Sequence, residues 1–223
     1  MDETPEHRMN TQTQPGPTVL YVMDAYCGWC WGFSKRVSDF EVANRHRVAF
    51  AVISGGLFIG PRAAPLSHYP FIAEANDRIA AMTGAVFGDD YQAVLRQGDL
   101  VMDSLDAAAA LAALRAQAPD RALHWAHALQ AAFYERGESL SSVDTVAAVA
   151  RAGGLDEAQV LRCLDDGTAR SWALADFERA QRLGVSSYPT LLFVRGDAVH
   201  RLPGTGATLE ALNRALDSLL GDR

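Results

Sequence analysis

Apolar positions follow two different periods along the chain. Runs of apolar residues typical of β-strands fall at 18–24, 47–54, 190–195 and 198–202. The stretch from Trp31 to about Arg45 instead carries apolar residues at helical spacing. From about 69 to 184 the helical spacing dominates, and we predict no strand there. The chain should therefore contribute strands from both ends of its sequence and helices from the middle.

Breaks between the apolar patterns divide this middle stretch into separate helices. We predict helices at about 70–83, 89–97, 104–117, 120–136, 142–152, 156–165 and 168–183, and a final amphipathic helix at 209–220. Asp156, followed three residues later by Gln159, is typical of a capping box at a helix start. The dense alanines of 107–113 favour a helix that packs closely on its neighbours.

The resulting order of elements is β-α-β, a long helical block, and then α-β-β-α. This order predicts an α/β protein with a mixed central sheet, flanked by helices and interrupted by an all-helical insertion subdomain. We expect the sheet domain at 18–65 and 170–223 and the insertion at 66–169. The polar residues 1–17 are predicted to be a disordered leader, within which Met9 is an alternative start.

Composition narrows the class of protein. The chain has 223 residues, 49% of them hydrophobic, and a formal net charge of −7. A negative surface disfavours nucleic acid and acidic membranes as partners. No apolar run approaches the ~20 residues of a membrane span, and the N-terminus lacks a signal-peptide pattern. Three cysteines make no structural disulfide framework, which together with these properties points to a cytoplasmic protein. We expect it to be a monomer or a weak dimer.

Cys27-Gly28-Trp29-Cys30 lies between the first predicted strand and the first predicted helix. Two cysteines at this spacing can form and break one disulfide. A helix N-terminus favours an anion, and a Cys-x-x-Cys motif there favours the thiolate, which is the reactive form of cysteine. In a cytosolic protein such a pair is more often catalytic than structural. We therefore predict that Cys27 is the nucleophile and Cys30 the resolving thiol.

Half of a zinc site is the alternative interpretation of the two cysteines. A structural zinc ion needs four ligands, and no second Cys-x-x-Cys motif exists in the chain. His124 and His127 share one face of a predicted helix, which we interpret as an exposed or half-buried face. Cys163 reads as a small apolar helix residue, since free cysteine is usually buried. We therefore predict no metal site.

Ser187-Tyr188-Pro189-Thr190 directly precedes the third predicted strand. Proline cannot donate to a β-ladder, so an ordinary trans proline at the start of an edge strand explains these residues. Only ~5–6% of X–Pro bonds in folded proteins are cis. The alternative is a cis proline that faces the cysteines.

Taken together, these motifs resemble the thioredoxin superfamily and, within it, the family of disulfide-bond-formation protein A (DsbA), over about residues 18–220. The run from Tyr26 to Phe33 and the later Ser54-Gly55-Gly56 look most like the cytoplasmic DsbA-like branch of predicted protein-disulfide isomerases. The resemblance implies a thioredoxin-like fold, a first cysteine that attacks and a second that resolves. It also implies that the residue before a cis proline offers its backbone to the substrate chain.

Carried onto this sequence, those roles fall on Cys27, Cys30 and the pair Tyr188-Pro189. Trp29, between the cysteines, is the candidate for an exposed apolar contact with substrate. Gly28, Asp24 and Tyr26 are supporting candidates beside the motif.

Two departures from the family pattern affect the expected chemistry. Many thioredoxin-fold proteins carry a buried carboxylate six residues before the first cysteine, where this chain has Tyr21. Asp24 lies three residues before Cys27, and we interpret it as a residue of the strand end or turn. Trp29 cannot become a cation beside the thiolate. We therefore expect a less oxidising disulfide than that of the strong periplasmic oxidant.

The sequence thus predicts a thiol–disulfide oxidoreductase or isomerase. Its expected substrates are protein or peptide thiols and disulfides, with glutathione as a further candidate, and no nucleic acid or membrane. It should need no metal or organic cofactor, only an external thiol that recycles the cysteine pair. One alternative is a redox-sensitive adaptor that binds a protein partner on the same fold. Another is a glutathione-dependent isomerase, although those relatives generally carry serine at the nucleophile position.

Overall fold

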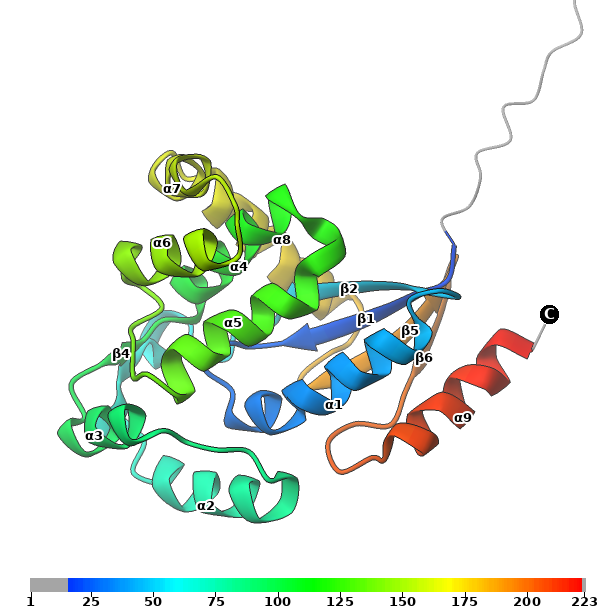
Figure 1. The fold of residues 1–223 in the computed structure, drawn as a ribbon, viewed down its shortest axis with the longest axis horizontal. Coiled ribbons are helices and arrows are strands. Elements are labelled where there is room, and N and C mark those ends of the chain that lie inside the picture. Colours follow the sequence, from blue (N-terminus) through cyan, green and yellow to red (C-terminus); the bar gives the residue numbers. More distant parts are fainter. Residues whose placement is uncertain (1–15, 222–223) are drawn as a thin grey trace, which may run out of the picture.

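A four-stranded mixed sheet forms the centre of the molecule in the computed structural model, which describes residues 16–221 (Figure 1). Its strands are β1 (Thr18–Met23), β2 (Ala49–Ser54), β5 (Thr190–Arg195) and β6 (Ala198–Arg201), in the order β2-β1-β5-β6. Strand β1 runs parallel to β2 and antiparallel to β5, which pairs antiparallel with β6. The predicted mixed sheet is confirmed, and the predicted leader lies almost entirely outside the described residues.

Helices surround this sheet. They are α1 (Gly28–Asn44), α2 (Ile72–Thr83), α3 (Asp89–Gln97), α4 (Ser104–Gln117), α5 (Ala122–Tyr134), α6 (Val143–Ala152), α7 (Glu157–Asp165), α8 (Thr168–Arg182) and α9 (Leu209–Gly221). Short 3₁₀ turns occur at Gly60–Arg62, Leu66–His68 and Pro119–Arg121. All the predicted helices are confirmed to within a few residues. The Asp156 carboxylate caps α7 by accepting the backbone N–H of Gln159 at 3.1 Å.

The prediction that 69–184 contains no strand is wrong at one place. Strand β4 (Val101–Met102) pairs antiparallel with β3 (Ala64–Pro65) in a separate two-stranded sheet. Two residues are too few to produce an alternating apolar pattern, which needs about four to eight residues. This short pairing was therefore invisible in the sequence.

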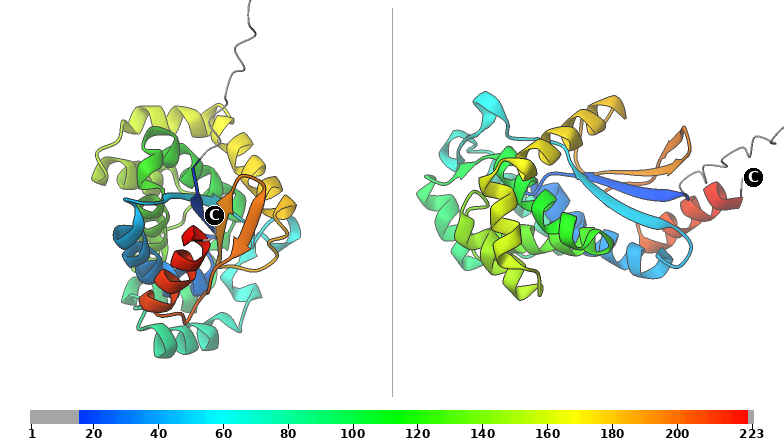
Figure 2. Two further views of the ribbon diagram at one scale, coloured as in Figure 1. Left: turned by 90° about the vertical axis from the view of Figure 1, so that its right-hand side faces the viewer. Right: turned by 90° about the horizontal axis from the view of Figure 1, so that it is seen from above.

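Alternate residues of β1 face two different layers, because successive side chains of a strand point to opposite faces. Val19, Tyr21 and Met23 belong to the larger hydrophobic cluster, which contains buried residues of α1, α5 and α9. Leu20 and Val22 belong to a smaller cluster with residues of β2, β5 and α8. Figure 2 shows α1 and α9 on one side of the sheet and α8 on the other. Both faces of β1 are therefore buried, and its C-terminal end is held firmly.

The helices between β2 and β5 share one hydrophobic core with the sheet. The larger cluster contains Tyr21 of β1 and Trp31 of α1 together with Trp125 and Tyr134 of α5.

Within residues 16–221, no helix combines the length and apolar character needed to span a bilayer.

A half-buried ion pair ties the helices to β2. Arg115 of α4 lies 2.9 Å from the carboxylate of Asp176 on α8. The Arg115 guanidinium also donates to the backbone carbonyl of Val52, and Asp176 Oδ2 accepts the backbone N–H of Ser54 at 3.2 Å. These bonds fix the end of β2 and, with it, the start of the loop that begins at Gly55.

Candidate active site

The two cysteines lie where β1 ends and α1 begins, and the loop before β5 faces them. Cys27 is the N-cap residue of α1, with extended backbone (φ −85°, ψ 111°). The Tyr188–Pro189 peptide bond is cis. Because β1 and β5 are neighbours in the sheet, the start of β5 comes next to the end of β1. The fold thus brings together two motifs that lie 161 residues apart.

Cys27 has polar partners on two sides. Its Sγ accepts the backbone N–H of Cys30 at 3.4 Å, in the position of a helix cap. Its thiol donates to the backbone carbonyl of Tyr188 at 3.6 Å. A free N–H at a helix N-terminus stabilises a negative charge on the capping atom. The prediction that Cys27 lies at the helix N-terminus is therefore confirmed.

Cys30 lies deeper than Cys27 and is expected to stay protonated. Its side chain is 0% exposed, whereas Cys27 is 5% exposed. Burial is the largest cause of a raised pKa for the Cys30 thiol, and the hydrogen bond and the charge of Cys27 raise it further. Both thiols are buried, and only Cys27 is slightly exposed, which is consistent with Cys27 as the nucleophile and Cys30 as the resolving thiol.

Tyr21 occupies the space behind Cys30 in place of a carboxylate. Its ring is buried and its hydroxyl donates to the backbone carbonyl of Cys30 at 3.4 Å. Burial raises the pKa of Tyr21 well above its ordinary value, and the nearby cysteines add to the shift. A neutral phenol cannot replace a carboxylate as the proton acceptor for Cys30, so this residue supports the helix start instead.

Asp24 links the cysteine loop to the loop after β2. Its buried carboxylate accepts the backbone N–H of Tyr26 at 2.9 Å and that of Leu57 at 2.7 Å. Burial raises the pKa of Asp24, although hydrogen bonds from Leu57, Ser104 and Tyr26 oppose the shift. The interpretation as a turn residue holds for the Tyr26 bond. The bond to Leu57 adds a second role, because it holds the loop after β2 next to the cysteine loop.

Replacing Asp24 by alanine should destabilise the fold by about 2 kcal/mol or more, because two backbone N–H groups lose their acceptor and each costs ~1–3 kcal/mol when buried unpaired. Burial raises the pKa of Asp24 in the folded state. Its contribution to stability is therefore complete only below the unfolded pKa of about 3.9 and falls as the pH rises through the folded value. Urea titrations at about pH 4.5 and about pH 7.5 should show the larger loss at the lower pH.

Asp77 of α2 provides the matched control, since it is exposed and Asp77→Ala should change stability by less than about 0.5 kcal/mol. A loss for Asp24→Ala that grows with pH would contradict the raised pKa.

Aromatic side chains hold the Cys27–Cys30 motif against α5 and the loop that follows α5. The Tyr26 hydroxyl accepts the backbone N–H of Leu140 at 3.0 Å, and the Tyr134 hydroxyl donates to the Tyr26 carbonyl at 2.6 Å. Trp31 stacks on Tyr134 with ring centroids 5.7 Å apart. Trp29 is only half-buried and packs against the edge of the core, so it is accessible for contact with substrate. Tyr26 is thus a buried anchor of the cysteine loop.

Two glycines allow other segments to approach the motif closely. A Cβ on Gly28 would lie 2.9 Å from Ile79 Cδ1 of α2. A Cβ on Gly55 would lie 1.9 Å from Cε1 of Tyr188, whose hydroxyl donates to the Gly55 carbonyl. The sequence left two interpretations of Gly55-Gly56 open, a simple turn after a strand and a turn that brings its backbone near the site. The contact with Tyr188 makes Gly55 a part of the site.

The remaining candidates for metal ligands do not gather. His124 and His127 are exposed on α5, and Cys163 of α7 is half-buried against the core. Among residues 16–221, no group of three or more His, Cys, Asp or Glu side chains is arranged to hold a metal ion.

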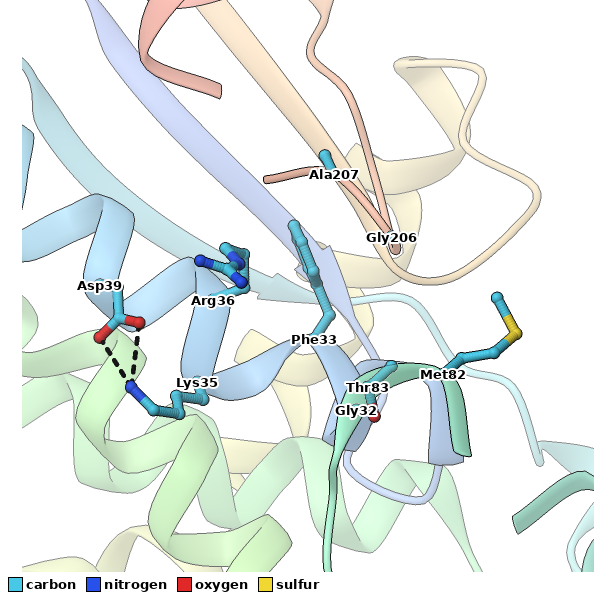
Figure 3. Close-up of a pocket in the computed structure, with 9 residues that line it drawn as sticks. All are labelled: Gly32, Phe33, Lys35, Arg36, Asp39, Met82, Thr83, Gly206 and Ala207. Carbon is cyan, nitrogen blue, oxygen red and sulfur yellow. Dashed lines mark hydrogen bonds and ion pairs between the residues drawn. The ribbon is translucent and has the colours of Figure 1, made fainter. Parts of the chain in front are cut away.

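A separate depression of about 290 Å³ lies between α1, the C-terminal end of α2 and the loop before α9. Figure 3 shows the residues that line it. It is lined by Gly32, Phe33, Lys35, Arg36, Asp39, Met82, Thr83, Gly206 and Ala207. Lys35 and Asp39 form an ion pair at 3.0 Å. Neither cysteine lines this depression, so we do not assign it to the active site.

The sequence of this chain also matches a known protein family. Residues 18–217 match the model of the DSBA-like thioredoxin domain. The chain belongs to this family. As a DsbA-like protein it is a thiol–disulfide oxidoreductase, in agreement with the predicted reaction class. No curated protein matches the sequence.

Solved structures share the fold of this DsbA-like protein over nearly its whole length. A "putative protein disulfide isomerase" from Nitrosomonas europaea has a TM-score of 0.79 at 21% identity, covering 92% of this chain and 98% of the other. The cytosolic disulfide reductase DsbM from Pseudomonas aeruginosa has a TM-score of 0.77 at 22% identity, covering 91% and 98%. Its structure with GSH has a TM-score of 0.72 at 22% identity, covering 91% and 99%.

Proposed function

We propose that this DsbA-like oxidoreductase attacks substrate disulfides with Cys27 and releases the product with Cys30. The asymmetry of the two thiols carries this assignment. Cys27 caps α1 beside the carbonyl of Tyr188 and retains some exposure, whereas Cys30 is fully buried with a raised pKa. Trp29 and the pair Tyr188-Pro189 are the proposed contacts for the substrate chain.

In the reductive direction the Cys27 thiolate attacks one sulfur of the substrate disulfide. A bond forms between Cys27 and that sulfur, the substrate disulfide breaks, and the departing thiolate takes a proton from water. Cys30 then gives its proton to solvent and attacks the Cys27 sulfur, which releases the second substrate thiolate to be protonated in turn. The substrate gains two electrons, and the enzyme is left with a Cys27–Cys30 disulfide that an external thiol reduces.

The proposed location is the cytoplasm, and the proposed net direction there is reduction or reshuffling of disulfides. Cytosolic thiol pools are reducing, so the enzyme disulfide would be reduced again after each cycle. A neighbour in fold, DsbM, is named as a cytosolic disulfide reductase, which supports the same direction for this chain.

Glutathione is the proposed small-thiol substrate or recycling thiol. A depression of about 520 Å³ lies beside Tyr188 and contains Arg62 and Ser186 in its lining. A guanidinium is suited to bind the carboxylate of a small peptide. The structure of DsbM with GSH supports glutathione as a candidate for this chain too.

The decisive experiment is turnover by the wild-type protein. Catalytic amounts should accelerate the reduction of insulin disulfides by dithiothreitol, followed as turbidity, well above the rate without enzyme. No acceleration with insulin, and none with oxidised glutathione coupled to glutathione reductase, would overturn the proposal. A redox-sensitive adaptor would then be the better description of the chain.

A further inference from the structure

Three segments that lie far apart in the sequence enclose the depression shown in Figure 3. Helix α1 contributes Phe33 and Arg36, the end of α2 contributes Met82, and the loop before α9 contributes Ala207. The hollow, about 290 Å³ in volume, therefore exists only in the folded chain. Because neither cysteine lines it, a molecule bound here would not occupy the site of disulfide exchange.

Two positively charged side chains and one negatively charged side chain line the depression. Lys35 Nζ lies 3.0 Å from the carboxylate of Asp39, so these two charges balance each other. Arg36 is half-buried, yet it forms no hydrogen bond or ion pair with any residue of 16–221. A charge that is partly removed from water without a partner costs free energy, which a bound anion recovers. The lining thus carries one unbalanced positive charge.

The chemistry of this lining favours a carboxylate over a phosphate. An arginine side chain is planar, and it pairs with a carboxylate through two parallel N–H···O bonds. One unbalanced positive charge matches one negative charge. A phosphate monoester carries between about 1.5 and 2 negative charges at neutral pH. The Asp39 carboxylate in the lining repels the excess negative charge of such a group.

The apolar residues of the lining limit the size of the ligand. Phe33 is only 2% exposed and therefore forms part of the floor, whereas Met82 is 66% exposed and lies at the rim. A methionine side chain adapts its shape to a neighbouring group. In another protein, an apolar cavity of about 150 Å³ holds one benzene molecule. A hollow of about 290 Å³ therefore has room for one ring or short alkyl chain together with a carboxylate.

We propose that this depression binds a small organic monocarboxylate. The carboxylate pairs with Arg36, and the apolar part of the ligand lies between Phe33 and Met82. The ligand does not react, and the site does not depend on the exchange reaction at Cys27. Binding should therefore persist in protein whose Cys27 has been alkylated with iodoacetamide.

Calorimetric titration of the alkylated full-length protein with hydrocinnamate tests this proposal. We expect saturable binding of one molecule per chain. The neutral analogue hydrocinnamamide should bind at least about tenfold more weakly, because it lacks the charge that pairs with Arg36. Phenyl phosphate should also bind more weakly than hydrocinnamate. No saturable binding of hydrocinnamate or of hexanoate, or equal affinity for the acid and the amide, would overturn the proposal.

Substitutions in α1 show whether the ligand binds in this depression. Arg36→Gln should weaken hydrocinnamate binding by at least about tenfold. Arg45→Gln changes an exposed arginine at the end of the same helix and should keep the wild-type affinity. Asp39→Asn removes the negative charge from the lining, so it should improve binding of phenyl phosphate relative to hydrocinnamate. Affinity that is unchanged in Arg36→Gln, or lowered equally in Arg45→Gln, would contradict the assignment.

Discussion

The Cys30→Ser variant should lose turnover by at least about 100-fold while keeping the first attack on substrate. Cys27 retains its cap position and its slight exposure of 5%, so it can still form the mixed disulfide. The buried thiol that would break this bond is gone. Intramolecular displacement corresponds to an effective thiol concentration far above that of any external thiol, on the order of 10⁵ M or more when well oriented. An external thiol in the millimolar range therefore resolves the adduct slowly.

The measurement has two parts. Turnover with insulin and dithiothreitol gives the loss in rate, and mixing the reduced variant with excess oxidised peptide gives the covalent adduct, detected by intact mass. Cys27→Ser should show neither turnover nor adduct. Cys163→Ser, at a half-buried position of α7, should behave as the wild type. Turnover by Cys30→Ser near the wild-type rate, or an adduct that requires Cys163, would show that the cysteine roles are assigned wrongly.

The parts of this site that the sequence predicted are those with local signals. Cys27 and Cys30 stand at a strand-to-helix junction, and both elements follow clear apolar periods. Tyr188-Pro189 has no such local signal, because an ordinary trans proline fits the same residues. It was assigned through the resemblance to the thioredoxin superfamily, and the pairing of β5 with β1 brings it beside the cysteines. The helix boundaries were predicted well because turn residues and glycines interrupt long periodic segments.

The parts that the sequence did not predict depend on contacts between distant segments. The bond from Asp24 to Leu57 and the contact of Gly55 with Tyr188 arise only after the loop that follows β2 folds over the cysteines. A pocket lined by Cys27 and by residues of α2 arises where α2 packs against the start of α1. In the sequence, the helical spacing of Ile72, Ala75 and Ile79 indicates a buried helix face. That spacing does not show which part of the protein the face covers.

Replacing Gly55 by alanine should lower kcat/KM for disulfide reduction by between about tenfold and 100-fold. The new Cβ would lie 1.9 Å from Cε1 and 2.2 Å from Cζ of Tyr188, so the ring must move. The hydrogen bond from the Tyr188 hydroxyl to the Gly55 carbonyl breaks when it does. Because the Tyr188 carbonyl lies beside Cys27, movement here misplaces the substrate chain, and a shift of about 1 Å can cost about 100-fold in rate.

A double-mutant cycle separates this cause from general damage. Tyr188→Ala removes the ring and should itself reduce the rate. In that background Gly55→Ala has nothing left to displace, so it should add little, whereas independent effects would multiply. Gly204→Ala is the control, because a Cβ at that position would have nothing within 4 Å, and it should keep the wild-type rate. If the effects of Gly55→Ala and Tyr188→Ala multiply, Gly55 does not act through Tyr188.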